Sequence, residues 1–274
     1  MKYNFQSAFK AVARLAGSVL FTGACLVIIG CGQNRQSGTQ TNPDPPSASP
    51  ETSAAPTEIP VSVLLHGVVR FDGPRPKRIP LKTQGDPKCA AMHGDIPLLS
   101  DGEIVTEDGG VQNAFVYLEN PPEHDGAVPE DTVVLDQLGC VYTPHVLGVR
   151  VGQPLDITNS DQTMHNIRSF SRKNRAFNNA QPAGAKKRTK MFKEVEMPIK
   201  MKCDFHPWMT AYIFVMDHPF FAVTDETGAF EIGDVPPGDY TLVSVHEKYR
   251  EQKLAVTVTD GAVDSAYFTY ASGG

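Results

Sequence analysis

The segment PHVLGVRVGQPLDITN, residues 144–159, decides the fold. A β-rich apolar stretch leads into a turn at Gly152-Gln-Pro154, and a second short apolar stretch follows, which predicts strand, turn and strand. Similar short strands continue along the chain without a long helical period, so we predict an all-β protein of antiparallel Greek-key sandwiches. Further strands are predicted at 61–71, 112–119, 133–136, 191–197, 199–205 and 211–216, and a short helix within 80–100 or 171–185.

A loop downstream combines three metal-binding side chains. Cys203, His206 and Met209 are spaced three residues apart in CDFHPWM, residues 203–209. A thiolate, an imidazole and a weak thioether suit copper, which accepts soft sulfur and borderline nitrogen donors in both oxidation states. One more imidazole is needed, and His165 in the upstream sequence MHN is the obvious donor. Zinc would favour a harder fourth ligand than a thioether.

Residues 140–216 resemble a cupredoxin, the small blue-copper fold. The resemblance is carried by the strand-turn-strand segment, the His-Asn pair after it and a Cys-x2-His-x2-Met loop of the amicyanin type, whereas plastocyanins generally have a longer gap between Cys and His. It implies one type 1 copper held by His165, Cys203 and His206, with Met209 as the weak axial ligand. It also implies that Asn166 ties the two ligand loops together and that a backbone hydrogen bond to the sulfur tunes the potential.

The ligand loop also supplies a predicted docking surface for a redox partner. Pro207 has no N–H, which leaves one fewer donor beside the loop. Trp208 is the only tryptophan of the chain, and it would line an apolar rim that the partner approaches. A position in the core is an equally good interpretation of this tryptophan. His206 would be the edge through which the electron leaves.

Other copper sites need residues that the sequence does not contain. A binuclear site would need a second cysteine four residues before Cys203, where Ile199 stands. Multicopper oxidases and copper nitrite reductases need extra histidines, often as His-x-His, and the chain has no such pair. Because Gly-x-Ser-x-Gly and His-Glu-x-x-His are also absent, we expect no enzymatic activity.

The C-terminal part has a different pattern. TDETGAF, residues 224–230, is followed by VPPGDYTL, residues 235–242, and together they resemble the transthyretin-like or carboxypeptidase-regulatory type of β-sandwich. The matching first strands, Gly67-Val-Val69 and Phe115-Val-Tyr117, come before the predicted copper segment. Two organisations therefore remain: one sandwich built from 61–130 and 217–274 with 131–216 inserted, or an N-terminal extension followed by two domains in series.

The first 60 residues predict export and attachment to a membrane. Residues 1–30 combine basic residues without acids and an apolar run, as in a signal peptide. The run ends in Ile-Ile-Gly-Cys31, which resembles a lipobox and makes Cys31 the expected lipidation site. Residues 31–60 are rich in Ser, Thr, Pro and Gln, which predicts a disordered tether. The expected location is periplasmic or at the cell surface, and the alternative to lipidation is an uncleaved transmembrane anchor.

Two cysteines remain after these assignments. Cys89 and Cys140 most simply form a disulfide, as cysteine pairs of exported proteins commonly do. The alternative is a second metal site that uses Cys89 with His93 and Cys140 with His145.

Charge is distributed unevenly along the chain. Residues 168–202 contain eleven Lys and Arg residues and two acidic residues, which gives a local charge of +9. The whole chain carries −6. This run is either a solvated loop or a docking surface for an acidic partner or anionic lipid, since opposed charges raise encounter rates. Nucleic acid is not expected outside the cytoplasm.

Two functions are compatible with these features. The first is a membrane-tethered blue-copper protein that carries single electrons between exported partners such as a cytochrome or a dehydrogenase. The alternative is a binding or scaffold protein in which the β-sandwich recognises a surface partner and copper is merely held.

Overall fold

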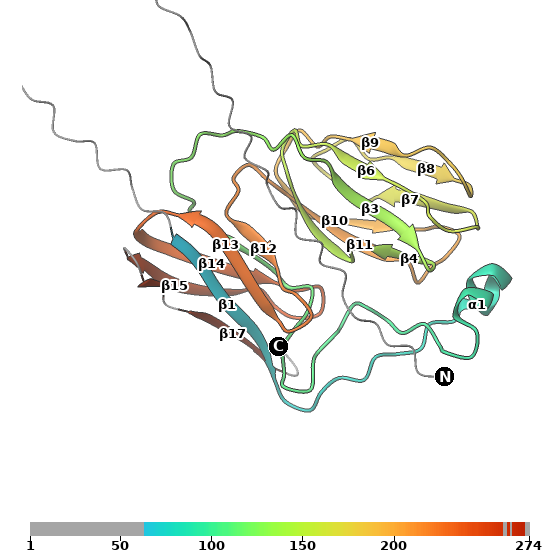
Figure 1. The fold of residues 1–274 in the computed structure, drawn as a ribbon, viewed down its shortest axis with the longest axis horizontal. Helices are drawn as coiled ribbons and strands as arrows, with labels where there is room; N and C mark the ends of the chain where they lie inside the picture. The colour runs from blue at the N-terminus through green and yellow to red at the C-terminus, as the bar shows by residue number, and fades with distance from the viewer. Residues whose placement is uncertain (1–62, 260–261, 264, 272–274) are drawn as a thin grey trace, which may run out of the picture. The chain divides into compact units, whose positions relative to one another are not determined.

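The computed structural model describes residues 63–259, 262–263 and 265–271. These residues form two β-sandwiches with little helix, which confirms the predicted all-β fold (Figure 1). The predicted signal peptide, the lipidation site Cys31 and the tether lie outside the described residues. Among the residues described, no helix has the length and apolar character that a membrane span requires.

The first sandwich, here called the split sandwich, combines strands from both ends of the described chain. Strand β1 pairs antiparallel with β13 and parallel with β17 in one sheet. Strand β2 lies between β12 and β14 in the other sheet, which continues to β15 and β16. This pairing corresponds to the discontinuous organisation. Its strands are β1 (Val63–Asp72), β2 (Phe115–Leu118), β12 (Phe221–Val223), β13 (Ala229–Val235), β14 (Gly238–Val245), β15 (Gln252–Thr259), β16 (Ala262–Val263) and β17 (Ala266–Ala271).

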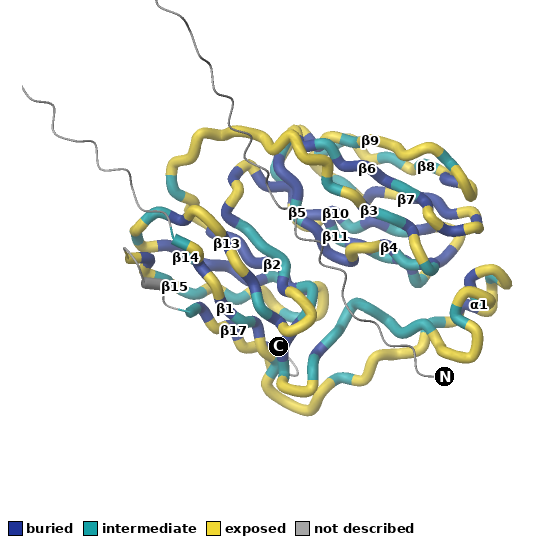
Figure 2. The backbone as a smooth tube through the Cα atoms, viewed as in Figure 1, coloured by how far each residue is buried: buried dark blue, intermediate teal, exposed yellow. Residues whose placement is uncertain are grey.

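The second sandwich, here called the inserted sandwich, is built from the chain between β2 and β12. Its sheets have the orders β5-β11-β10-β7-β8 and β4-β3-β6-β9, and a buried apolar cluster fills the space between them. Figure 2 shows buried residues along strands of both sheets. Its strands are β3 (Val133–Leu138), β4 (Val141–Thr143), β5 (Val146–Arg150), β6 (Leu155–Ile157), β7 (His165–Ser169), β8 (Asn178–Gln181), β9 (Arg188–Lys190), β10 (Glu196–Lys202) and β11 (Thr210–Met216).

Glycine fixes two close approaches in the split sandwich. Inward positions of β1 alternate as Leu65, Gly67 and Val69, and a Cβ on Gly67 would lie 2.1 Å from the backbone oxygen of Ala266 in β17. The turn before β13 ends at Gly228, whose φ of +83° is readily adopted only by glycine. At both positions a residue larger than glycine would be strained.

Aromatic side chains connect the two sandwiches. The rings of Phe115 in β2 and Phe214 in β11 stack at 4.0 Å, and Phe221 stacks on Phe115 at 5.4 Å. A polar contact lies in the same region, where His145 Nε2 is 2.5 Å from Glu247 Oε1. The sandwiches therefore share a small core of their own.

Residues 83–93 form the helical segment that the sequence placed within 80–100. It contains a 3-10 turn, η1 (Thr83–Gly85), and one short helix, α1 (Pro87–His93), and we call this segment the cap. Asp86 is the N-terminal capping residue of helix α1, because its side chain accepts hydrogen bonds from the backbone N–H groups of Lys88 and Cys89. The alternative helix within 171–185 is wrong, because β8 occupies that region.

Candidate metal centre

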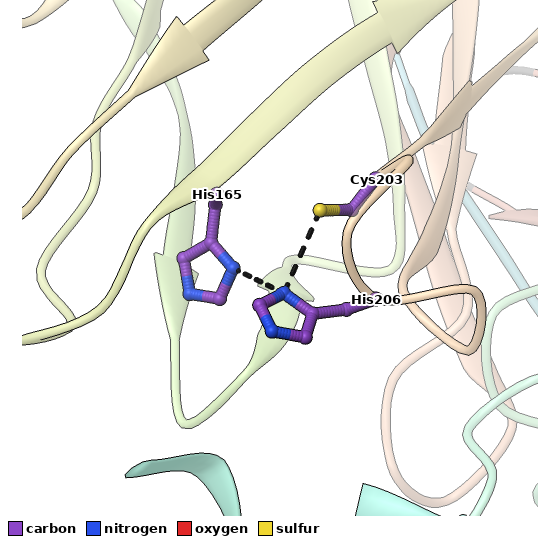
Figure 3. Close-up of side chains that lie close together, drawn as sticks. All are labelled: His165, Cys203 and His206. Atoms are coloured by element: carbon purple, nitrogen blue, oxygen red, sulfur yellow. Dashed lines mark hydrogen bonds between the residues drawn. The ribbon is translucent and has the colours of Figure 1, made fainter. Parts of the chain in front are cut away.

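Three predicted ligands meet at one end of the inserted sandwich. His165 begins β7, Cys203 follows β10, and His206 lies three residues farther along the same loop. One donor atom from each side chain lies within 4.8 Å of the other two (Figure 3). His165 Nδ1 and His206 Nδ1 are 2.8 Å apart, and Cys203 Sγ is 3.6 Å from His206 Nδ1. All three residues are buried, with at most 2% of each exposed.

Carboxylates determine which nitrogen of each ring faces this centre. Asp161 Oδ2 lies 2.8 Å from His165 Nε2, and Asp86 Oδ2 lies 3.0 Å from His206 Nε2. An ionised carboxylate only accepts hydrogen bonds, so each Nε2 donates and, in the neutral ring, each Nδ1 carries a lone pair. Two lone pairs at 2.8 Å repel each other unless a cation lies between or beside them.

Without a metal, a proton serves as that cation. Burial disfavours the charged ring of His165, but its hydrogen bonds to Asp161 and Cys203 outweigh burial and raise its pKa to about 9. With a metal, the same geometry offers two imidazole nitrogens and one thiolate to a shared ion. Histidine ligands that donate their other nitrogen to a carboxylate are the usual arrangement in metal sites. The donor set therefore fits a copper ion.

Cys203 is held in a form suited to metal binding. Burial alone would raise its pKa, but hydrogen bonds from His165 and from backbone groups of the two ligand loops lower it below the usual value. Its sulfur also lies 3.3 Å from Asn166 Oδ1, and the same oxygen accepts a 2.7 Å hydrogen bond from the Asp204 N–H. Asn166 thus joins the two ligand loops through its side chain. Since the thiolate is the form that binds metals, this environment favours ligation.

Met209 is placed in the same core. It is 1% exposed and belongs to the apolar cluster that contains Cys203. Its N–H donates to the His206 carbonyl at 2.9 Å, and its carbonyl accepts from the Cys203 N–H at 3.2 Å. These two bonds close the loop that carries all three residues. The axial role of Met209 remains a prediction.

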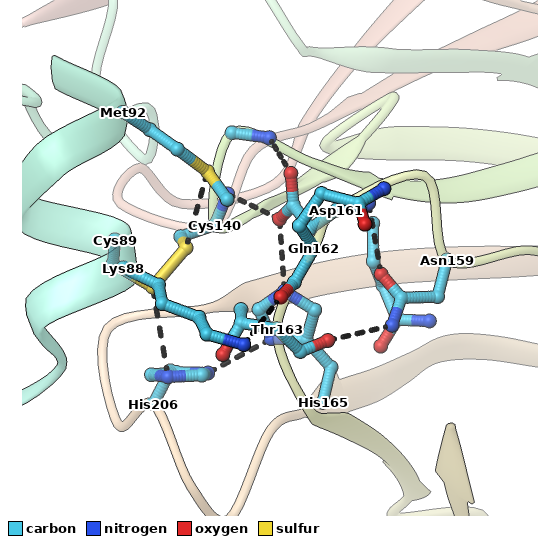
Figure 4. A network of polar contacts seen from close by, with 12 residues as sticks. Lys88, Cys89, Met92, Cys140, Asn159, Asp161, Gln162, Thr163, His165 and His206 are labelled. Carbon is cyan, nitrogen blue, oxygen red and sulfur yellow. Dashed lines mark hydrogen bonds and ion pairs between the residues drawn. A yellow bond between two sulfur atoms is a disulfide. The ribbon is translucent and has the colours of Figure 1, made fainter. Parts of the chain in front are cut away.

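The cap lies over His206, and a disulfide attaches it. Cys89 of α1 is bonded to Cys140, and Cys89 Sγ lies 3.6 Å from His206 Nε2 (Figure 4). Thr163 donates to Asp86 at 3.2 Å, and Lys88 Nζ donates to the Gln162 carbonyl at 2.8 Å. His206 is consequently only 2% exposed. That the electron leaves through His206 remains a prediction.

The predicted docking residues differ in exposure. Pro207 is exposed, whereas Trp208 is half-buried and packs against the core of the inserted sandwich. The indole N–H of Trp208 donates to the Cys140 carbonyl at 3.0 Å, and its ring centre lies 5.0 Å from that of His206. Trp208 therefore combines features of both sequence interpretations, and its docking role remains a prediction.

The disulfide removes both cysteine ligands from the alternative metal site. Because Cys89 and Cys140 are bonded to each other, neither offers a thiolate to a second ion. His93 instead contacts the Gly139 carbonyl at 2.9 Å, and His145 lies between Asp101 and Glu247. Both histidines thus have other partners.

The two carboxylates behind the histidines were not predicted from the sequence. Asp161 stands four residues before His165, a spacing that could have suggested a contact. It also accepts hydrogen bonds from the N–H groups of Gly139 and Cys140, which fix its orientation. Asp86 is 120 residues from His206 and carries no local signal, because only the folded cap brings it there.

Comparisons with known proteins gave matches to solved structures alone. No family model and no curated protein matches the chain. A purple cupredoxin from Nitrosopumilus maritimus is 24% identical over 31% of this chain and 99% of its own, with a TM-score of 0.27. A mutant of amicyanin in the Cu(I) form is 18% identical over 37% of this chain and 98% of its own, with a TM-score of 0.28.

The copper-containing nitrite reductase from Thermus scotoductus SA-01 is 18% identical, with a TM-score of 0.30. The match covers 35% of this chain and only 25% of that enzyme's length. Scores and identities this low say nothing of the function of this chain, whose own donor atoms indicate copper.

Proposed function

We propose that the protein is a membrane-tethered electron carrier with one type 1 copper. The observation that carries the proposal is the convergence of two Nδ1 atoms and a thiol of lowered pKa in a buried space. Two imidazoles and a thiolate, with a weak thioether beside them, suit both oxidation states of copper. His165, Cys203 and His206 would hold the ion and Met209 would be the axial ligand. Copper would supply reversible one-electron transfer.

The packing of the ligand residues supports transfer rather than turnover. Asp161 and Asp86 hold the imidazoles, and Asn166 holds the cysteine loop, so the ligands are fixed before the metal binds. A site that changes little between oxidation states needs little reorganisation. We accordingly propose no enzymatic activity, and we place the donor and acceptor among exported redox proteins. Lipidation at Cys31 would keep the protein at a membrane.

A copper titration followed by visible spectroscopy tests this function. The wild-type protein should bind one copper and show an intense thiolate-to-copper band. Cys203→Ser and His165→Gln should abolish that band. His66→Gln, which changes an exposed histidine of β1, should leave it unchanged. A colourless wild-type protein after copper addition would refute the proposal.

A second function, copper holding by a binding or scaffold protein, is favoured by one observation. The cap covers the imidazole of His206, and a closed site suits retention of an ion. Cyclic voltammetry distinguishes the two functions, because a carrier should give a reversible wave and exchange electrons quickly. A holding protein should bind copper without such a wave.

A further inference from the structure

The ligand loop has one covered side and one open side. The cap contacts His206 through Asp86 and Cys89. Phe205, between the two loop ligands, is 57% exposed, and Asp204 beside it is also exposed. A partner protein can therefore reach the loop next to Cys203 more easily than it can reach the buried His206 ring.

A chain of contacts connects this open side to the sulfur of Cys203. Arg168 Nη1 lies 3.6 Å from Asp204 Oδ1, and Asn166 Nδ2 donates to Asp204 Oδ2 at 3.0 Å. Asn166 Oδ1 in turn lies 3.3 Å from Cys203 Sγ. Arg168, a surface residue of β7, is thus separated from the sulfur by two side chains.

Positive charge gathers beside this route. On the sheet that contains β7 and β10, Lys202 pairs in register with Arg168, and Lys200 lies two residues before Lys202 on the same face. The turn after β7 adds Arg172 and Lys173, both exposed. We call these five residues, Arg168, Arg172, Lys173, Lys200 and Lys202, the basic face.

The basic face is preformed and partly apolar. Glu196 is buried and fixes the turn by accepting hydrogen bonds from Ser171 Oγ at 2.6 Å and the Asn174 N–H at 3.0 Å. The Glu196 carboxylate is therefore already paired with hydrogen-bond donors of the turn. Phe170 is 44% exposed and carries Arg168 over its ring at 4.9 Å. Two shallow grooves of about 570 and 670 Å³ lie along this surface and share Phe170 and Arg172.

We infer that an acidic surface of a partner protein docks on the basic face and exchanges its electron beside Cys203 rather than through His206. The inference rests on the proposed function. Opposed charges would steer the partner, and the exposed rings of Phe170 and Phe205 would provide apolar contact at the centre. In the oxidative direction, one electron passes from the Cu(I) protein to the oxidant, which leaves the Cu(II) form and an oxidant reduced by one electron.

Charged small oxidants can locate the route. The full-length copper protein is reduced and mixed with hexacyanoferrate(III), an anion, or with tris(phenanthroline)cobalt(III), a cation, and the return of the visible band is timed. The test variant is Arg172→Glu with Lys200→Glu. The matched control, here called the cap variant, is Lys77→Glu with Lys82→Glu, which changes the net charge equally but at exposed residues of the segment that leads into the cap.

We expect the basic-face variant to react at least about tenfold more slowly with hexacyanoferrate(III) at low salt, within the range known for electrostatic steering. It should react faster than wild type with the cobalt cation, and both differences should vanish at high salt. The cap variant should stay within about twofold of wild type.

Three results would overturn the inference. Equal slowing in both variants would show that only net charge matters, and stronger slowing in the cap variant would place the route at His206. The third result concerns vesicles. If the wild type binds phosphatidylglycerol vesicles more tightly than phosphatidylcholine vesicles, and the basic-face variant loses this preference, the basic face binds lipid instead. An unchanged visible band in both variants keeps these outcomes separate from a failure of the proposed copper function.

Discussion

Asp86 Oδ2 lies 3.0 Å from His206 Nε2, although 120 residues separate the two in the chain. The same carboxylate caps helix α1 and accepts from Thr163. It thus connects the cap, the metal centre and a loop of the inserted sandwich. A negative charge at this position favours the more positive oxidation state of any ion bound to His206.

Asp86→Asn should raise the reduction potential of the bound copper. Asparagine still caps a helix, but it removes the charge that stabilises Cu(II). A tenfold change in relative affinity for the two states corresponds to about 59 mV for a one-electron couple, and we expect a shift of this size by voltammetry. Asp95→Asn removes an exposed charge from the loop after α1 and should leave the potential almost unchanged. Equal shifts in both variants would argue against a specific role for Asp86.

Replacing both disulfide cysteines, Cys89→Ser with Cys140→Ser, should loosen the cap. Their separation of 51 residues corresponds to a loss of about 4 kcal/mol in the free energy of unfolding, measurable by urea denaturation. A Cu(I) chelator should also remove the metal markedly faster. Met92→Leu, a change on the same helix that keeps the disulfide, should match wild type in both measurements.

Stability should be greatest near neutral pH. Burial disfavours the charged form of His145, but Asp101 and Glu247 outweigh burial and raise its pKa to about 9. This histidine therefore contributes stability that is complete below about pH 6.5 and is lost as the pH rises to about 9.

On the acid side, burial lowers the pKa of His218 and of His246 to about 4. The unfolded chain binds more protons at these two groups, so stability should fall as the pH drops from about 6.5 towards 4. Urea denaturation across this range checks both limbs. In the metal-free protein His165, whose pKa is also raised to about 9, shares the alkaline limb. His145→Gln should therefore reduce the alkaline limb and leave the acid limb unchanged, and a variant with an unaltered alkaline limb would contradict the assignment.

Gly67→Ala should destabilise the split sandwich. The added methyl group would lie 2.1 Å from a backbone oxygen of β17, which cannot rotate away as a side chain could. We expect a loss of at least about 2 kcal/mol, as for overpacked cores. Gly233→Ala in β13 has nothing within 4 Å of its new Cβ and should change stability by less than about 1 kcal/mol. Thermal unfolding of the two variants compares them directly.

The sequence predicted features that depend on local pattern. Apolar, β-rich stretches indicated strands such as β1 and β11, and the loop from Cys203 to Met209 indicated a metal centre whose nitrogen and sulfur donors converge in the structure. The strands predicted at 191–197 and 199–205 are instead the single strand β10. These predictions needed only neighbours in the chain.

Features that depend on distant partners were not predictable. Strand β8, with the sequence NNAQ, has no apolar alternation, and it is held by a polar network around Gln181. The Gln181 side chain accepts from Gln137 at 2.8 Å and donates to the Ile157 carbonyl at 3.0 Å. The burial of His206 likewise depends on a cap far away in sequence, so no local pattern indicated it.

The parallel pairing of β1 with β17 has a consequence for the order of folding. Contacts between the two ends of the described chain form late, because closing a long loop costs more entropy than closing a short one. Every strand of the inserted sandwich lies between residues 133 and 216, so its own contacts are far more local. We expect this middle part to fold first and to hold β2 and β12 near each other. The last described strand, β17, would then pair with β1, which was synthesised long before it.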